Sequence, residues 1–255
     1  MRHGAAAARA APSAQPRRDS WPFWPTGAAG KPLAPRHRMR GRRSIVVFAA
    51  IVAGCSTVRT PTPVPPPAPT PSVAEPAARL PCPRDARLDG WERRLRRDPW
   101  VRQSLARGQQ YLPRLRVIMA RHGLPSSLAL LPTLESGFDP RARGRYGELG
   151  LWQLRRPTAR QFGLVVSARR DERLEPERAT EAAARYLAAL RDRYGEWPLA
   201  LAAYNAGERR VDRALAHEPN ATFWELAAHG RLPRTSQNFV PRFMALVRLA
   251  EPKSC

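Results

Sequence analysis

The chain has 255 residues, of which 44 are Lys or Arg and 21 are Asp or Glu, so its formal net charge is +23. The length allows one or two domains, and the charge suggests an anionic partner such as nucleic acid, a membrane surface or an acidic polymer. The charge is nearly all Arg, and the chain is also rich in Ala and Pro. A GC-rich coding sequence produces this bias equally well, so charge alone does not select nucleic acid. The first eighty or so residues are Pro- and Ala-rich without apolar periodicity, which excludes a packed core there.

The first recognisable element is a segment of the signal-peptide type. Met39–Arg43 is positively charged, Ser44–Gly54 is an apolar stretch of eleven residues, and Cys55 follows. A membrane span needs about 20 apolar residues, so this stretch is too short to cross a bilayer. A positive region, a short apolar region and small residues before a cleavage point are typical of a secretory signal peptide. We therefore predict a signal peptide at 39–54, and we interpret residues 1–38 as a misassigned extension. The alternative is a buried strand or helix followed by a chance Cys.

The end of this segment and the residues after it indicate a lipid anchor on a tether. Val52–Cys55 resembles a bacterial lipobox, in which the Cys becomes the acylated first residue of the mature protein. By resemblance to lipoprotein sorting in Gram-negative bacteria, Ser56 implies the periplasmic face of the outer membrane. Thr60–Pro76 is Pro-rich and cannot build a core, because Pro lacks an N–H group and fixes φ. Such a segment extends about 50 Å as polyproline II, so we predict that residues 55–81 form a tether.

Two further cysteines, Cys82 and Cys255, lie near the ends of the predicted domain, residues 82–255. An oxidising compartment permits disulfides, and domain termini often lie close together. We predict a Cys82–Cys255 disulfide; the alternative is two unrelated thiols.

The predicted domain is all-α, because helical spacing dominates from Leu88 onward and no segment alternates as a strand does. Pro113 and Pro132 lie inside two of the expected helices and can kink them. Helix-start and helix-stop residues bound several elements. The expected helices include one around Leu112–Met119, one over Ser126–Glu135, one over Glu181–Tyr194 ended by Gly195, one over Leu199–Ala206 opened by Pro198 and ended by Gly207, and one over Asn238–Ala250.

Three segments carry residues suited to chemistry. Glu135 ends an apolar helix, so we expect it to be partly buried; burial disfavours a carboxylate's charged form, and a general acid must hold its proton near neutral pH. In Gly147–Gln153, the glycines suit a backbone that approaches a ligand closely, Trp152 can stack on a sugar and Gln153 can bond sugar amides and hydroxyls. Leu201–Gly207 places a Tyr and an Asn just before a helix-ending Gly. Each segment alone is equally a surface carboxylate, a core Trp or a helix cap.

Together the three segments resemble a known family. ES at 135–136, GLWQ at 150–153 and AYNAG at 203–207 are similar to the three signature motifs of the soluble lytic transglycosylase (SLT domain) family, and most similar to its membrane-bound lytic murein transglycosylase D branch. The resemblance covers about residues 110–250. It also includes Ala168–Asp171, Ala179–Thr180, Leu232–Pro233 and Phe239–Leu246.

This resemblance implies a lysozyme-like, mainly helical fold. It also implies cleavage of the β-1,4 bond between N-acetylmuramic acid and N-acetylglucosamine in peptidoglycan glycan strands, leaving 1,6-anhydro-muramyl ends. Glu135 would protonate the glycosidic oxygen and then act as base on the muramyl 6-hydroxyl. No cofactor, metal or nucleic acid is expected, and possible cell-wall protein partners are unknown. The substrate-binding residues that the resemblance implies are Ser136, Gly150, Trp152, Gln153, Tyr204 and Asn205.

The chain departs from the family pattern at three places. Gly144 stands where the family usually has Ser, Glu148 stands in place of Ala, and Thr235–Ser236 aligns with a Glu-Thr pair. Most glycosidases use two carboxylates, whereas we see no second one in a matching position, and we expect Asp139 and Glu148 to be surface residues. Two alternatives stay open: a hydrolytic muramidase on the same fold, and a peptidoglycan-binding lipoprotein that has lost catalysis.

Overall fold

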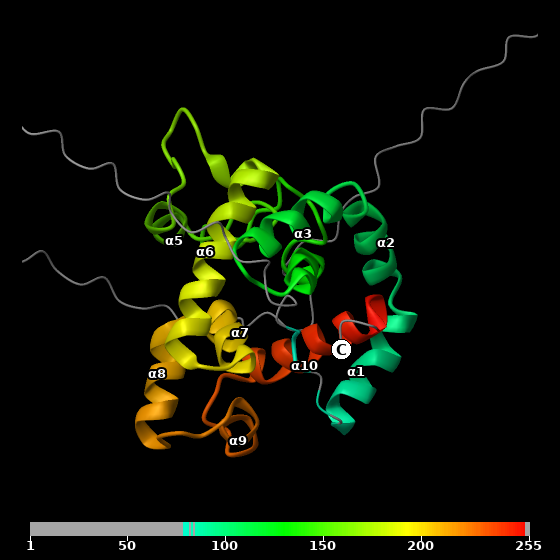
Figure 1. Cartoon of the computed structure of the whole chain (residues 1–255), viewed down its shortest axis with the longest axis vertical. Coiled ribbons are helices and arrows are strands. Elements are labelled where there is room, and N and C mark those ends of the chain that lie inside the picture. The colour runs from blue at the N-terminus through cyan, green and yellow to red at the C-terminus, as the bar shows by residue number, and fades with distance from the viewer. Residues whose placement is uncertain (1–78, 82, 84, 253–255) are drawn as a thin grey trace, which may run out of the picture. The chain divides into compact units, whose positions relative to one another are not determined.

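The structure of the chain is a computed structural model that describes residues 79–81, 83 and 85–252 (Figure 1). Within these residues the regular elements are helices; extended pairing is limited to isolated antiparallel bridges. The expected all-α class is therefore confirmed. The helices in chain order are α1 (Ala86–Arg97), α2 (Pro99–Gly108), α3 (Leu112–Arg121), the 3-10 helix η2 (Ser126–Leu130), α4 (Leu131–Glu135), α5 (Arg156–Gln161), the 3-10 helix η3 (Glu172–Leu174), α6 (Pro176–Tyr194), α7 (Trp197–Ala206), α8 (Glu208–His217), α9 (Phe223–Ala228) and α10 (Arg234–Ala250).

Aspartate side chains cap the first two helices. The Asp85 carboxylate accepts the backbone N–H of Arg87 at 2.7 Å, and Asp98 accepts that of Trp100 at 2.9 Å. Each bond satisfies one of the amide groups that a helix N-terminus leaves without an intrahelical partner. Asp98 also ends α1, and Pro99 follows it in the first turn of α2, where proline's fixed φ suits the helix.

The first and last helices, α1 and α10, pack against each other (Figure 1). Leu88, Trp91 and Leu95 form the buried stripe of α1. Ion pairs join the outer edges of the two helices, since Arg248 of α10 lies 2.5 Å from Asp89 and 2.7 Å from Glu92. Exposed ion pairs contribute at most about 1 kcal/mol each, so we attribute the contact mainly to the apolar stripe.

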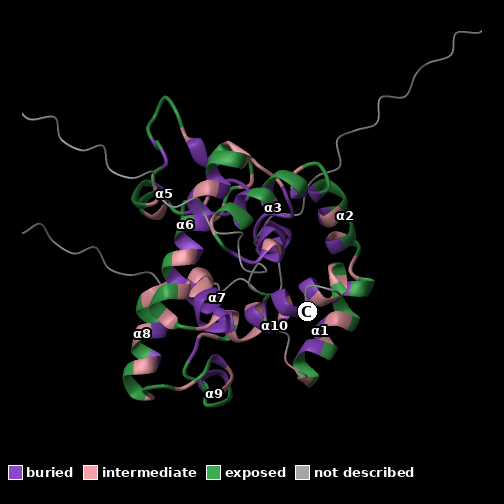
Figure 2. Ribbon diagram, viewed as in Figure 1, coloured by how far each residue is buried: buried purple, intermediate pink, exposed green. Residues whose placement is uncertain are grey.

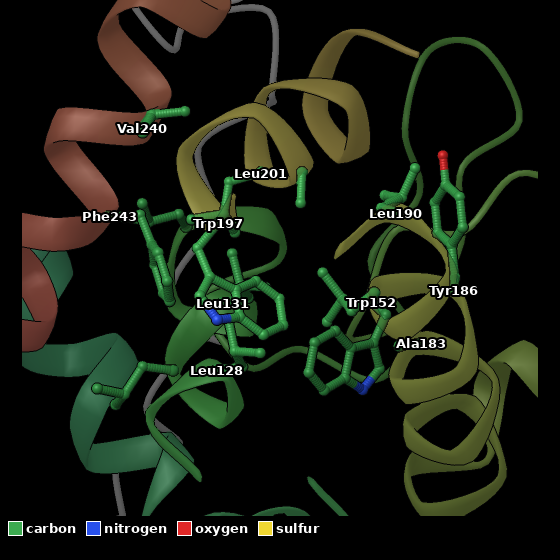
Figure 3. Packing of buried hydrophobic residues seen from close by; sticks show 14 of the residues in the cluster. Leu128, Leu131, Trp152, Ala183, Tyr186, Leu190, Trp197, Leu201, Val240 and Phe243 are labelled. Atoms are coloured by element: carbon green, nitrogen blue, oxygen red, sulfur yellow. The ribbon is translucent and has the colours of Figure 1, made fainter. Parts of the chain in front are cut away.

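Helix α7 lies in the core and positions the third motif. All residues from Trp197 to Ala203 are buried, and α7 packs against α6, α8, α9 and α10 (Figure 2). A helix that is apolar on every side is stable only when it is enclosed. Gly195, at φ 70°, ends α6 and turns the chain into α7. Figure 3 shows Trp197 and Leu201 of this helix near Leu131 of α4, and all three belong to one hydrophobic cluster.

The predicted helix bounds are largely confirmed, and the differences have local causes. α6 begins at Pro176, five residues before the predicted Glu181, and α10 begins at Arg234, four before Asn238. The segment Ser126–Glu135 is not one helix: η2 ends at Leu130 and α4 follows it, with Pro132 in the first turn of α4. Pro113 likewise lies in the first turn of α3. Neither proline kinks a helix interior, because the first turn tolerates a residue without an N–H group.

Several predictions concern residues outside the described part of the chain. The signal peptide at 39–54, lipidated Cys55 and the Cys82–Cys255 disulfide all lie there. Leu80, at the end of the predicted tether, is buried in the hydrophobic cluster of the domain. Among the residues that the structure describes, no helix combines the length and apolar character needed to cross a membrane.

Candidate active site

Glu135 is the last residue of α4 and lies inside the protein. All five residues of α4 are buried, and Glu135 is only 7% exposed. Pro132 starts this short helix directly after η2, whose residues Ser127–Leu130 are also buried. The burial expected from the apolar sequence is therefore observed, whereas an ordinary surface position for this carboxylate is not.

The backbone turns sharply after Glu135. Gly137 has φ 63° and Phe138 has φ 58°, so two consecutive residues adopt left-handed conformations. A bulky side chain is rare in this region; here the Phe138 ring is 1% exposed and stacks on Tyr111 at 6.3 Å between ring centroids. Arg107 of α2 donates its Nε–H to the Gly137 carbonyl at 2.8 Å. Strained backbone of this kind persists where packing holds it and concentrates at functional sites.

The second motif forms a loop that is held from inside by its own side chains. Gln153, at φ 48°, donates from Nε2 to the carbonyls of Ala142 at 3.0 Å and Gly150 at 2.7 Å. Gly150 has φ 79°, and a Cβ there would lie 1.9 Å from the Arg173 carbonyl oxygen. Only glycine fits this position, because the backbone of η3 passes directly against it.

The Arg173 side chain supports the same loop. Its Nη1 donates to the carbonyls of Gly147 at 2.8 Å and Leu154 at 3.0 Å, so it joins the two ends of the loop. Its side chain is 5% exposed, and Asp171 pairs with it at 2.7 Å. Hydrogen bonding from Arg173 lowers the pKa of Asp171, so the pair stays charged at neutral pH.

Hydrogen bonds to main-chain carbonyls bring the three motifs together. Ser136, which follows Glu135, donates its hydroxyl to the Leu151 carbonyl at 2.8 Å. Tyr204 of α7 donates its hydroxyl to the Trp152 carbonyl at 2.7 Å. Burial, and then the nearby negative charge of Glu135, raises the pKa of Tyr204, so its hydroxyl keeps the proton that it donates. The first motif thus joins the second, and the third motif joins the second beside Glu135.

Asn205 connects α7 to the last helix. Its Oδ1 accepts the hydroxyl of Ser236 at 3.0 Å, and Ser236 is fully buried in the first turn of α10. In the sequence, Thr235–Ser236 stands out only as a departure from the family pattern. The contact assigns Ser236 a structural role beside the third motif, and its signal in the sequence was the alignment at that position.

Trp152, Gly150 and Gln153 of the second motif all make close contacts within the protein. Trp152 does not offer a face to a sugar: it is 1% exposed, and its indole Nε1 donates to Thr180 of α6 at 2.9 Å. Figure 3 shows Trp152 among the buried side chains near Ala183. Gly150 approaches the Arg173 backbone closely, where the sequence suggested a ligand. Gln153 is 6% exposed and donates two Nε2 hydrogen bonds within the loop. In the structure, Trp152 thus anchors the loop to α6, Gly150 allows its close approach to η3, and Gln153 satisfies two of its carbonyls.

The two carboxylates nearest to Glu135 in sequence are used in local turns. Asp139 accepts the backbone N–H of Arg141 at 2.8 Å, and Glu148 accepts that of Tyr146 at 2.9 Å. Both are partly exposed. Across residues 79–81, 83 and 85–252, no three His, Cys, Asp or Glu side chains gather in a group that could hold a metal ion.

The chain is similar to known proteins over part of its length. The transglycosylase SLT domain family matches residues 118–227, which contain all three motifs. Membrane-bound lytic murein transglycosylase D of Escherichia coli is 32% identical over 157 residues, covering 60% of this chain and 34% of that protein. A protein of Alteromonas sp. whose name refers to tributyltin chloride resistance is 35% identical over 122 residues, covering 48% of this chain and 58% of that protein.

A solved structure is also similar. An inactive mutant of the lytic transglycosylase Slt of Pseudomonas aeruginosa gives a TM-score of 0.48 at 25% identity, covering 56% of this chain and 24% of that chain. The matched part of this chain spans about a third of the Escherichia coli protein. Residues 118–227 are thus similar to the transglycosylase SLT domain family, and part of the chain is similar to membrane-bound lytic murein transglycosylase D.

Proposed function

We propose that this protein is a peptidoglycan lytic transglycosylase in which Glu135 acts first as acid and then as base. The observation that carries the proposal is the placement of Glu135: a buried carboxylate at the end of α4, next to a strained turn and joined through Ser136 to the second motif. The match to the SLT domain and the names of the relatives, which describe transglycosylases acting on murein, support the choice of reaction and polymer.

The reaction that this site supports needs one carboxylate. Glu135 protonates the oxygen of the β-1,4 bond between N-acetylmuramic acid and N-acetylglucosamine, and the bond from the muramyl C1 to that oxygen breaks. The resulting Glu135 carboxylate takes the proton of the muramyl 6-hydroxyl, and the sugar's own 6-oxygen forms the new bond to C1. The proton that Glu135 gave away is thereby restored, and no water is consumed. A tethered nucleophile of this kind reacts as if at very high local concentration.

The neighbouring groups have positioning roles in this proposal. Ser136 and Tyr204 hold the Leu151 and Trp152 carbonyls, so the loop keeps one geometry beside Glu135. Asn205 is half-buried at the end of α7, and we assign its amide to the substrate side of the site. Glu135 itself is the only residue to which we assign proton transfer.

Digestion of purified sacculi tests the reaction. We expect wild-type protein to release muropeptides with anhydro ends, which are lighter than reducing ends by about 18 Da, the mass of one water. Glu135→Gln should abolish cleavage, because the amide keeps the shape but cannot deliver a proton, and circular dichroism should show the variant folded. Mainly reducing muramic ends would identify a hydrolytic muramidase, and sacculi left intact by wild-type protein would identify a binding protein.

We also propose that Cys55 is lipidated and that residues 55–81 tether the domain to the periplasmic face of the outer membrane. The support is the lipobox-like Val52–Cys55 and the Pro-rich segment after it, together with relatives whose names describe them as membrane-bound. Cys55→Ala should move the protein from the membrane fraction to the soluble periplasmic fraction. An unchanged distribution would place the attachment elsewhere, for example in the basic surface.

A further inference from the structure

A hollow lies beside the second motif, on the side formed by the preceding residues of the loop. Its volume is about 320 Å³, and it is formed by the segment 143–149, by residues 155–157 and by Arg173. The hollow lies next to the candidate active site along the chain, because Leu149 in its wall is followed by Gly150–Gln153. Leu149 also pairs in isolated bridges with Arg143 and Leu154, so the wall and the motif form one folded unit.

The hollow is strongly basic. Four arginines and one glutamate line it. Among the residues that the structure describes, Arg143, Arg155 and Arg156 form no ion pair and no side-chain hydrogen bond, and all three are exposed. The charge of Arg173 is balanced by Asp171.

The carboxylate in the wall does not neutralise these arginines. Glu148 is held by its bond to the backbone N–H of Tyr146, and it forms no ion pair within the described part of the chain. Arg156 is attracted at longer range by Asp171, whose pKa it helps to lower. The guanidinium groups of Arg143 and Arg155 have no ion-pair partner among the described residues, and all three arginines line one concavity. Guanidinium groups in this state bind carboxylates well, because their N–H groups match the two carboxylate oxygens.

We propose that this hollow is a subsite for the carboxylates of the peptides that peptidoglycan carries on muramic acid. The proposal rests on the proposed function, which brings a muramic acid residue to Glu135. Its peptide begins at the sugar and bears several free carboxylates, so it must leave the glycan site alongside the protein surface. The wall of the hollow continues directly into the loop that Ser136 and Tyr204 hold at that site.

The size of the hollow favours a short peptide over a polymeric anion. A volume of about 320 Å³ accommodates one or two side chains, whereas nucleic acid or a lipid surface needs an extended basic face. The exposed ring of Tyr146, 44% accessible, lies in the wall and offers an apolar contact for the aliphatic part of such a peptide.

Binding of a free peptide tests the subsite without any cleavage. The probe is the tripeptide L-Ala-γ-D-Glu-meso-diaminopimelate, and its carboxylate-amidated form is the comparison; affinities for the full-length chain are measured by calorimetry. The variant is Arg155→Gln/Arg156→Gln, whose exposed side chains form no ion pair and no side-chain hydrogen bond within the described residues. The matched control is Arg93→Gln/Arg97→Gln, which removes the same charge from two exposed arginines of α1, a helix far from α5 in Figure 1.

We expect the Arg155→Gln/Arg156→Gln variant to bind the free tripeptide about tenfold more weakly, since two exposed charge pairs together contribute about a factor of ten in affinity. The control should bind normally, the amidated peptide should bind weakly to every form, and Arg155→Lys/Arg156→Lys should recover part of the affinity. Equal loss in variant and control would mean a general charge effect and would overturn the proposal, as would equal affinity for both peptides. Binding of anionic phospholipid vesicles or DNA that depends on these arginines, without tripeptide binding, would also overturn it.

Cleavage assays separate this proposal from the proposed function. On glycan with intact peptides, the variant should show a KM about tenfold higher with kcat unchanged, because the arginines would bind the substrate and the transition state equally well. If wild-type protein cleaves no glycan but binds the tripeptide as described, the proposed function fails and the subsite stands. If it cleaves glycan normally and binds no tripeptide, the subsite fails and the proposed function stands.

Discussion

The close contact between Gly150 and η3 gives a sharp test of how the second motif is built. An alanine Cβ at position 150 would lie 1.9 Å from the Arg173 carbonyl oxygen. A side-chain rotation cannot relieve this clash, because the carbonyl belongs to the backbone. Gly150 also has φ 79°, a conformation that costs an L-residue about 1–2 kcal/mol. Gly150→Ala must therefore strain the backbone and also push the loop away from η3.

The two costs can be separated with a second glycine of the same loop. Gly147 has φ 85°, but a Cβ there would meet no atom within 4 Å. Gly147→Ala should cost only the conformational strain, about 1–2 kcal/mol, whereas Gly150→Ala adds about 1–3 kcal/mol for overpacking. In a domain of this size 1 kcal/mol lowers Tm by about 2–4 °C, so the melting temperatures of the two variants should differ by several degrees.

Urea unfolding and thermal melting measure the two variants side by side, and sacculus digestion follows their activity. Gly150→Ala should also lose more activity than its stability loss explains, because the displaced loop carries the Leu151 and Trp152 carbonyls that Ser136 and Tyr204 hold. Equal destabilisation by the two substitutions would refute the close contact, and with it the account of why glycine occupies position 150.

Two further predictions concern buried polar contacts. Thr180→Val keeps the shape but leaves the buried Trp152 Nε1–H without its 2.9 Å acceptor, so urea unfolding should show a loss of about 1–3 kcal/mol in the free energy of unfolding. Thr133→Val is the control, since the Thr133 hydroxyl is buried with no hydrogen-bond partner among the described residues. A similar loss in both variants would contradict the role of the Trp152 hydrogen bond. Arg173 lowers the pKa of Asp171, so the pair stabilises the fold above the ordinary pKa of Asp, about 3.9, and the stabilisation is lost as pH falls through the lowered value. Asp171→Asn should therefore lose less stability than wild type when unfolding is measured at pH 3 in place of pH 7, and an unchanged pH dependence would show that the pair contributes nothing.

The helices were predictable from the sequence because their signals are local. Apolar spacing located α3, and Gly195 and Gly207 marked the ends of α6 and α7, since both adopt positive φ that other residues disfavour. The division of Ser126–Glu135 into η2 and α4 was not predicted. Periodicity continues across that junction, whereas the structure restarts the helix with Pro132 in a first turn.

The interior of the second motif could not be predicted in the same way, because it depends on contacts between distant segments. A Trp beside a Gly and a Gln suggests a sugar platform, yet the Trp152 partner, Thr180, is 28 residues away on α6. Arg173 lies 26 residues from Gly147, whose carbonyl it binds. Sequence patterns give residue types and local spacing; they do not say which carbonyl groups of a loop remain for distant donors to satisfy.

The hydrogen bonds that join the motifs go mainly to main-chain carbonyls. Ser136, Tyr204 and Gln153 bind the carbonyls of Leu151, Trp152 and Gly150. These bonds fix the backbone of the loop without using the side chains of the outer wall. A substitution on the outer wall, such as one at Glu148, can therefore change what the neighbouring hollow binds while the geometry beside Glu135 is preserved. In such an arrangement one reaction site can coexist with different surroundings, because the donors that fix the loop are separate from the groups that face a ligand.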